Sequence, residues 1–125
     1  RLPIQYALTY PDIRTSIVPE LRLEQLGALT FESPDFDRFP CLNLAYQAGR
    51  IGGITPTVLN AANEVAVAGF MGGKIGFMDI PRIVEKCLAD HEKLDSPSLE
   101  EILAIDQETR VKAQEFVDTG RMIRS

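Results

Sequence analysis

The sequence predicts an all-α fold, in which a small four- to five-helix bundle follows a proline-rich extended arm. From residue 39 onward, apolar residues recur at helical spacing, and prolines and glycines stand where helices would begin and end. Earlier, Pro3, Pro11, Pro19 and Pro34 divide the chain into pieces too short for long regular structure. We therefore expect an arm over residues 1–38, a helical domain over 39–117 and a frayed tail over 118–125.

Length and charge narrow the class of protein. A chain of 125 residues is the size of a single domain. Its net charge of −5 argues for solubility and against a surface that binds nucleic acid or anionic membranes. No apolar run approaches the roughly 20 residues of a membrane-spanning helix. The sequence opens at Arg1 rather than at a methionine, which leaves open a processed product, a separate domain or part of a longer chain.

The arm carries more large apolar side chains than a disordered linker would. Residues 4–8 could form one helical turn, and residues 28–31 read as a short extended piece. Prolines prevent the arm from building a core of its own, so it must lie on another surface. We expect residues 26–31 to pack on the bundle and residues 2–10 to reach toward another domain. The apolar residues concerned are Tyr6, Leu8, Tyr10, Leu26, Leu29 and Phe31.

Two helices open the helical domain. The first is expected over residues 40–47, with Gly49 as its stop. The second is expected over residues 56–71, capped by Thr55 and ended by Gly72 and the glycine after it. The expected inward residues of the first helix are Leu42, Leu44 and Ala45.

Further helices follow after a short connector. Asp79 is expected to cap a helix over residues 80–89. Ser98 and Glu101 have the spacing of a capping box, which predicts a short helix through Leu103. Asp106 would then cap a last helix. The helix over residues 80–89 and the last helix both carry apolar residues at helical spacing. These residues are Ile83, Val84, Cys87 and Leu88 in the former and Val111, Ala113, Phe116 and Val117 in the latter.

The residues that most often carry chemistry are scarce. Cys41 and Cys87 each fall inside an apolar helical pattern, which favours buried thiols that pack as small hydrophobes. His91 is the single histidine and stands among charged residues near a helix end, which predicts a solvated side chain. With no second histidine, a multi-histidine zinc site is excluded for this chain alone, and the solvated setting expected for His91 argues against histidine-dependent nucleophilic catalysis.

Three polar residues interrupt the apolar second helix. Asn60 lies one helical turn from both Asn63 and Glu64, so the three share a neighbourhood. Amides do not titrate, so acid–base work would fall on Glu64 alone, and a metal site would need more than one anionic oxygen. We therefore interpret Asn60, Asn63 and Glu64 as structural residues that satisfy backbone groups of neighbouring loops, for example those of the arm.

Four segments together resemble the carboxyl-terminal region of the 1-deoxy-D-xylulose 5-phosphate reductoisomerase family. They read RLPIQYALTYP (1–11), LGALTFESPDFDRFPCLNLAYQAG (26–49), PTVLNAANEVAVAGF (56–70) and FMDIPRIVE (77–85). The resemblance runs from Arg1 to about Val117 in the order of the family. LNAANE and the LTFESPDFDRFPCL block are its most specific parts.

The resemblance implies an enzyme of non-mevalonate isoprenoid biosynthesis. This family rearranges a ketose phosphate and reduces the resulting aldehyde with NADPH, giving 2-C-methyl-D-erythritol 4-phosphate. A divalent metal, Mg²⁺ or Mn²⁺, stabilises the charge that develops on the substrate oxygens. Family members are homodimers whose subunits contain a nucleotide-binding domain, a catalytic domain and a carboxyl-terminal helical domain. They are located in the bacterial cytoplasm or the plastid stroma.

The resembling segments include none of the motifs of this family that bind NADPH, metal or substrate phosphate. We therefore assign no catalytic, cofactor-binding or metal-binding residue here. The fragment alone is expected to be inactive, with the nucleotide-binding and catalytic domains of its own chain as its partners. An alternative remains open, in which the chain acts alone as a helical protein-interaction module and the arm docks onto another protein.

Overall fold

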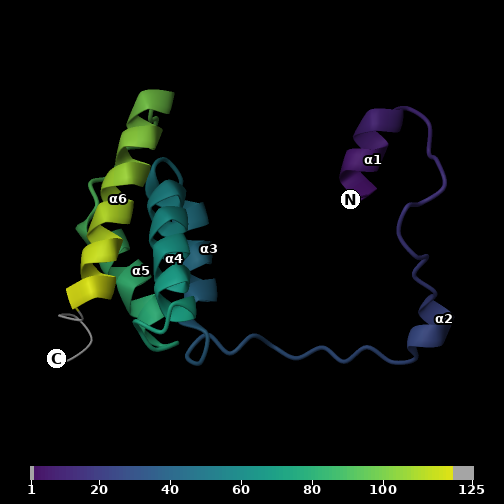
Figure 1. Ribbon diagram of the computed structural model, residues 1–125, viewed down its shortest axis with the longest axis horizontal. Helices are drawn as coiled ribbons and strands as arrows, with labels where there is room; N and C mark the ends of the chain where they lie inside the picture. Colours follow the sequence, from purple (N-terminus) through teal and green to yellow (C-terminus); the bar gives the residue numbers. More distant parts are fainter. Residues whose placement is uncertain (1, 120–125) are drawn as a thin grey trace. The chain divides into compact units, whose positions relative to one another are not determined.

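The computed structural model describes residues 2–119, and within that range every regular element is a helix (Figure 1). The chain divides into two compact units, Arg1–Ser33 and Pro34–Ser125. The all-α class predicted from the sequence is therefore confirmed. The second unit begins a few residues earlier than the boundary after residue 38 that the sequence suggested.

The first unit is more helical than the expected extended arm. It contains α1 (Leu2–Thr9) and α2 (Leu23–Leu26). Pro3 does not prevent α1, because a proline in the first helical turn removes an amide that would have no partner there. The prediction of a single turn over residues 4–8 was therefore too short.

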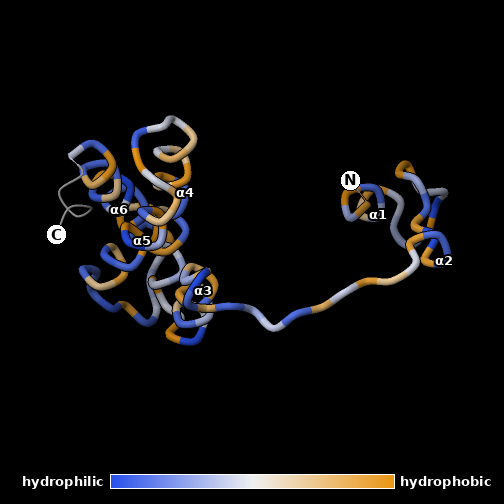
Figure 2. The backbone as a smooth tube through the Cα atoms, turned by 90° about the horizontal axis from the view of Figure 1, so that it is seen from below, coloured by the Kyte–Doolittle hydropathy of each residue, from blue (hydrophilic) through white to orange (hydrophobic). Residues whose placement is uncertain are grey.

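Gln5 holds the segment that returns along α1. Its Nε2 donates a hydrogen bond to the carbonyl oxygen of Thr15 at 2.7 Å, and its Oε1 accepts one from the amide of Ile17 at 3.2 Å. The rings of Tyr6 and Tyr10 meet edge to face, with centroids 5.8 Å apart. Neither α1 nor α2 buries a residue, and Figure 2 shows apolar residues spread along this unit.

The second unit is a four-helix bundle. Its helices are α3 (Pro40–Ile51), α4 (Thr55–Met71), α5 (Asp79–Asp90) and α6 (Leu99–Thr119). Helix α4 packs against the other three, as Figure 1 shows. The largest fully buried side chains belong to Ile54, Val58, Ile83 and Val84.

Helix α3 continues past its expected end. Gly49 lies inside the helix, and the helix ends at Gly52, whose φ of 73° suits a glycine and whose amide donates to Ala48 at 2.9 Å. The inward face also differs from the prediction, because Leu42 and Ala45 are exposed. The residues of α3 that face the core are Cys41, Leu44 and Ala48.

Two of the expected caps were wrong. Thr55 is the first residue of α4 rather than its cap, and its hydroxyl contacts His91. Asp79 is the first residue of α5, and its carboxylate accepts a hydrogen bond at 2.8 Å from the amide of Gly76, which lies before the helix and not in its first turn. The predicted end of α4 is confirmed, since the amide of Gly72 donates to the carbonyl oxygen of Ala68 at 2.9 Å.

The last two predicted helices form one continuous helix, α6. The capping box that opens it is confirmed: the amide of Ser98 donates to Glu101 Oε2 at 2.7 Å, and the amide of Glu101 donates to Ser98 Oγ at 3.2 Å. Asp106 lies inside the helix and binds Arg110, so it does not begin a new helix. Residues 118 and 119, assigned to the tail from the sequence, are helical, and the rest of that tail lies outside the described residues.

Candidate functional site

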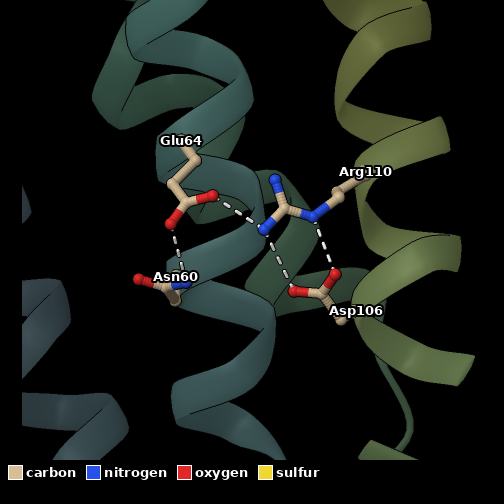
Figure 3. Close-up of polar contacts among 4 residues, drawn as sticks. All are labelled: Asn60, Glu64, Asp106 and Arg110. Atoms are coloured by element: carbon tan, nitrogen blue, oxygen red, sulfur yellow. Dashed lines mark hydrogen bonds and ion pairs between the residues drawn. The ribbon is translucent and has the colours of Figure 1, made fainter. Parts of the chain in front are cut away.

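The three polar residues of α4 do not form one site. Glu64 reaches Arg110 of α6 and accepts a hydrogen bond from Asn60 (Figure 3). Asn63, one residue before Glu64, lines a different surface. Successive residues of a helix are separated by about 100° around its axis, so positions 60 and 64 share a side that position 63 leaves.

Asn60 and Glu64 belong to a hydrogen-bonded network that joins α4 to α6. The amide of Asn60 donates to Glu64 Oε1 at 3.2 Å, and Arg110 donates to Glu64 Oε2 at 2.7 Å. The same guanidinium binds Asp106 through Nε at 2.7 Å and through Nη2 at 3.3 Å. Figure 3 shows Arg110 held between the two carboxylates. We call these four residues the α4–α6 network.

The charges of Glu64 and Arg110 stay fixed near neutral pH. Hydrogen bonds from Arg110 and Asn60 lower the pKa of Glu64, and the hydrogen bonds of Arg110 to Asp106 and Glu64 raise its own pKa. A carboxylate with a lowered pKa is a poor general base or acid at neutral pH. The network is therefore suited to joining two helices and not to moving protons.

The geometry changes how these residues were interpreted. The sequence predicted that they satisfy backbone groups of neighbouring loops, but Asn60 and Glu64 are exposed and bind side chains instead. Arg110 was missed, because it is far from Glu64 in the sequence. The i,i+4 spacing of Asp106 and Arg110 was the one available signal, and it predicts a pair within α6 only.

Asn63 lines an open apolar depression of about 220 Å³ in the second unit. The depression is formed where the start of α3 and the start of α5 flank the middle of α4. Its walls are apolar except for Asn63 and Arg38. The lining residues are Arg38, Phe39, Pro40, Cys41, Asn63, Val67, Phe77, Met78, Ile80 and Pro81.

His91 is half-buried rather than solvated as the sequence suggested. Its Nδ1 donates to the carbonyl oxygen of Leu88 at 2.6 Å, which leaves Nε2 to bind the hydroxyl of Thr55 at 3.1 Å. The ring thus links the end of α5 to the start of α4. Both ring nitrogens have structural partners, so His91 is not arranged as a ligand or as a base.

The remaining reactive groups form no metal site. Cys87 is buried, which raises the pKa of its thiol to about 11, and burial also raises the pKa of the half-buried Cys41. Within residues 2–119, no three histidine, cysteine, aspartate or glutamate side chains gather to hold a metal ion. In the same range, no helix combines the length and apolar character needed to cross a membrane.

The chain is similar to known reductoisomerases over nearly its whole length. The family model of the DXP reductoisomerase C-terminal domain matches residues 1–112. The 1-deoxy-D-xylulose 5-phosphate reductoisomerase of Desulforamulus reducens is 56% identical over 117 residues, which cover 94% of this chain and 30% of that enzyme. The Bacillus subtilis enzyme is 55% identical over 112 residues, which cover 88% of this chain and 29% of that enzyme.

Solved structures agree with the sequence relatives. The Zymomonas mobilis reductoisomerase in complex with NADPH matches with a TM-score of 0.82 and 42% identity, over 94% of this chain and 31% of that one. A reductoisomerase structure with fosmidomycin and magnesium matches with a TM-score of 0.79 and 40% identity, over 92% of this chain and 31% of that one. The present chain thus spans about 30% of the length of the relatives that it matches.

Proposed function

This chain belongs to the DXP reductoisomerase family as a carboxyl-terminal domain, and on that premise we propose that it is the structural carboxyl-terminal portion of a 1-deoxy-D-xylulose 5-phosphate reductoisomerase. The complete enzyme would form 2-C-methyl-D-erythritol 4-phosphate in non-mevalonate isoprenoid biosynthesis. The observation that carries the proposal is the 56% identity over 94% of this chain, confined to 30% of the related enzyme.

The cofactors of the proposed enzyme would bind outside this chain. NADPH and magnesium are present in solved structures of related reductoisomerases, and we infer the use of NADPH with Mg²⁺ or Mn²⁺ by the complete enzyme. The carboxylates of Glu64 and Asp106 do not fit a metal, because Arg110 already binds both. In this proposal Asn60, Asn63 and Glu64 are structural, and the fragment alone neither binds cofactor nor turns over substrate.

The proposed partners are the nucleotide-binding and catalytic domains of the same polypeptide, in a homodimer. Residues 1–38 would link these domains to the helical domain, with residues 2–10 lying on the catalytic domain and residues 26–31 on the bundle. Large apolar side chains of this segment, among them Ile4 and Leu8, are exposed in the present chain. Their exposure supports the proposal that another domain covers the linker in the complete enzyme. We propose the bacterial cytoplasm or the plastid stroma as the location.

A second candidate function is a helical protein-interaction module that acts alone. The same exposed apolar residues of the first unit favour it, because they could bind another protein instead of a catalytic domain. The two candidates differ in whether this chain can replace the corresponding part of an active reductoisomerase.

A chimaera of the Bacillus subtilis relative tests the proposal. The carboxyl-terminal segment of that enzyme that aligns with this chain would be exchanged for residues 1–119, which keep helix α6 whole, and substrate-dependent NADPH oxidation would be measured. We expect activity within about tenfold of the parent enzyme, since the catalytic machinery is left in place.

Two controls bracket the result. The parent enzyme without its carboxyl-terminal segment should be inactive, which would show that the segment is required. A chimaera that folds cooperatively and forms dimers, yet has no activity, would contradict the proposed function and favour the interaction module.

A further inference from the structure

The apolar depression on the second unit is lined by side chains that the bundle does not need for its own core. Asn63 and Val67 lie one helical turn apart on α4 and form one wall, and Phe77 and Met78 before α5 form another. Phe39, 51% exposed, and Phe77, 56% exposed, both line the depression. Exposed aromatic side chains gathered in one place mark a surface that binds something.

The surface extends beyond the depression along α4. Phe70 lies one further turn from Val67, and its ring meets that of Phe77 edge to face with centroids 5.7 Å apart. Among the lining residues, Arg38 is the single charged one. A charge-poor surface of aromatic, methionine and aliphatic side chains is typical of the buried core of a permanent interface rather than of a transient contact.

Asn63 gives this apolar surface a specific polar group. Its side chain is half-buried in the wall of the depression, while its neighbours on α4, Ala62 and Ala66, are fully buried. A side-chain amide can donate and accept hydrogen bonds at once, as a peptide group does. An amide in an apolar wall is therefore suited to bind the backbone of a segment that covers the depression.

The length of the related enzymes indicates what covers the apolar depression. In each related reductoisomerase the region like this chain is about 30% of one continuous polypeptide, so the remainder is permanently tethered to the carboxyl-terminal domain. We propose that the Asn63 depression is the surface on which the amino-terminal remainder of the reductoisomerase chain docks, with Phe39, Phe77 and Met78 buried and the Asn63 amide bound to its backbone. This inference rests on the proposed function and adds the location of the interdomain contact.

Cys41 provides a direct probe, because it lines the depression while Cys87 is buried in the core. Alkylation of the Cys41 peptide would be followed by mass spectrometry at one fixed pH, in the isolated 125-residue chain and in the Bacillus subtilis chimaera. We expect Cys41 to react at least tenfold more slowly in the chimaera, because the docked remainder would cover the depression.

Variants of the depression connect this protection to the named residues. In the chimaera, the double variant Phe77→Asn and Met78→Gln should restore most of the Cys41 reactivity, and Asn63→Ala should restore part of it. The matched control is Leu103→Asn with Val111→Asn, two α6 side chains that are 62% and 51% exposed and do not line the depression. The control should leave the protection unchanged.

The outcomes separate this inference from the proposed function. Equal Cys41 reactivity in the isolated chain and in an active chimaera would overturn the docking surface and leave the function intact. Protection in an inactive chimaera would support docking while contradicting the function. Protection of the isolated chain that increases with its concentration would assign the surface to a second copy and overturn the proposal. If the chimaera is insoluble, the same labelling with and without the separately produced amino-terminal portion of the relative decides between protection and its absence.

Discussion

Neighbouring residues on α4 have different roles because helix geometry turns them to different surfaces. Glu64 binds Arg110 of α6 and is itself bound by Asn60, while Asn63 lines the apolar depression. The α4–α6 network is only partly buried, since Asn60 and Glu64 are exposed, so its contribution to stability is limited by screening and by the entropy of ordering long side chains. The network orients α4 relative to α6, because one guanidinium binds carboxylates on both helices.

Glu64 makes the stability of the bundle depend on pH. Because Arg110 lowers the pKa of Glu64 below its ordinary value of 4.5, the folded state favours the ionised form. The resulting stabilisation is complete above the unfolded pKa and is lost as pH falls through the folded pKa. We expect the urea midpoint of Glu64→Gln to lie slightly below that of the wild type at pH 7, and the difference to shrink progressively as pH falls below 4.5.

Urea unfolding of both proteins at pH 7, 5, 4 and 3 measures this difference. Glu115→Gln is the matched control, since Glu115 is also an exposed glutamate but lies outside the α4–α6 network. Added salt should shrink the Glu64 difference at pH 7. A difference that grew on acidification would contradict the lowered pKa.

At the scale of elements, close approach of α4 to α6 depends on a glycine. A Cβ atom at position 69 would lie 2.8 Å from Val117 Cγ1 and 3.0 Å from Val117 Cγ2, closer than packed carbon atoms tolerate. Val117 is itself buried, so it has little room to move. Gly69 therefore allows the two helices to bury their facing surfaces.

Gly69→Ala should destabilise the bundle by about 1–3 kcal/mol, the usual cost of inserting a methyl group into a packed interior. Gly49→Ala is the matched control, because Gly49 is also helical but a Cβ there would meet nothing within 4 Å. That variant should be more stable by up to about 1 kcal/mol, from helix propensity alone. Chemical denaturation measures both, and equal effects of the two substitutions would contradict the close contact.

At the scale of the whole molecule, we propose a supporting role because the ionisable groups of the described residues are bound to one another. The carboxylates of Glu64 and Asp106 are bound by Arg110, and both nitrogens of His91 have structural partners. A nucleotide phosphate would need a cradle of backbone amides or cationic side chains, and the sequence has no glycine-rich phosphate loop. We propose that the chemistry of the complete enzyme belongs to the rest of the reductoisomerase chain.

We accordingly expect the 125-residue chain to show no saturable binding of NADPH. Isothermal titration of the chain with NADPH, with and without Mg²⁺, measures this, and the intact Bacillus subtilis relative is the positive control. Saturable binding in the micromolar range would place part of the cofactor site in this chain and contradict the assignment of every site to the remainder.

Local signals in the sequence determined much of the bundle. Helical spacing of Ile83, Val84 and Cys87 correctly predicted the buried face of α5, and the Ser98–Glu101 capping box correctly predicted the start of α6. These features depend on residues within a few positions of one another, so a single sequence contains the information. The resemblance to the reductoisomerase family was also present in the sequence and is confirmed by the family match.

Only the tertiary structure decided what distant residues do to one another. Thr55 has the chemistry of a helix cap, but His91, 36 positions away, offers its hydroxyl another hydrogen-bonding partner. Arg110 binds Glu64 from 46 positions away, a contact that exists only because α4 and α6 pack together. Local propensities differ by about 1 kcal/mol or less per residue, so contacts made on folding can override them. The separation of Asn63 from the α4–α6 network likewise depends on where α3, α5 and α6 pack around α4, which no local pattern encodes.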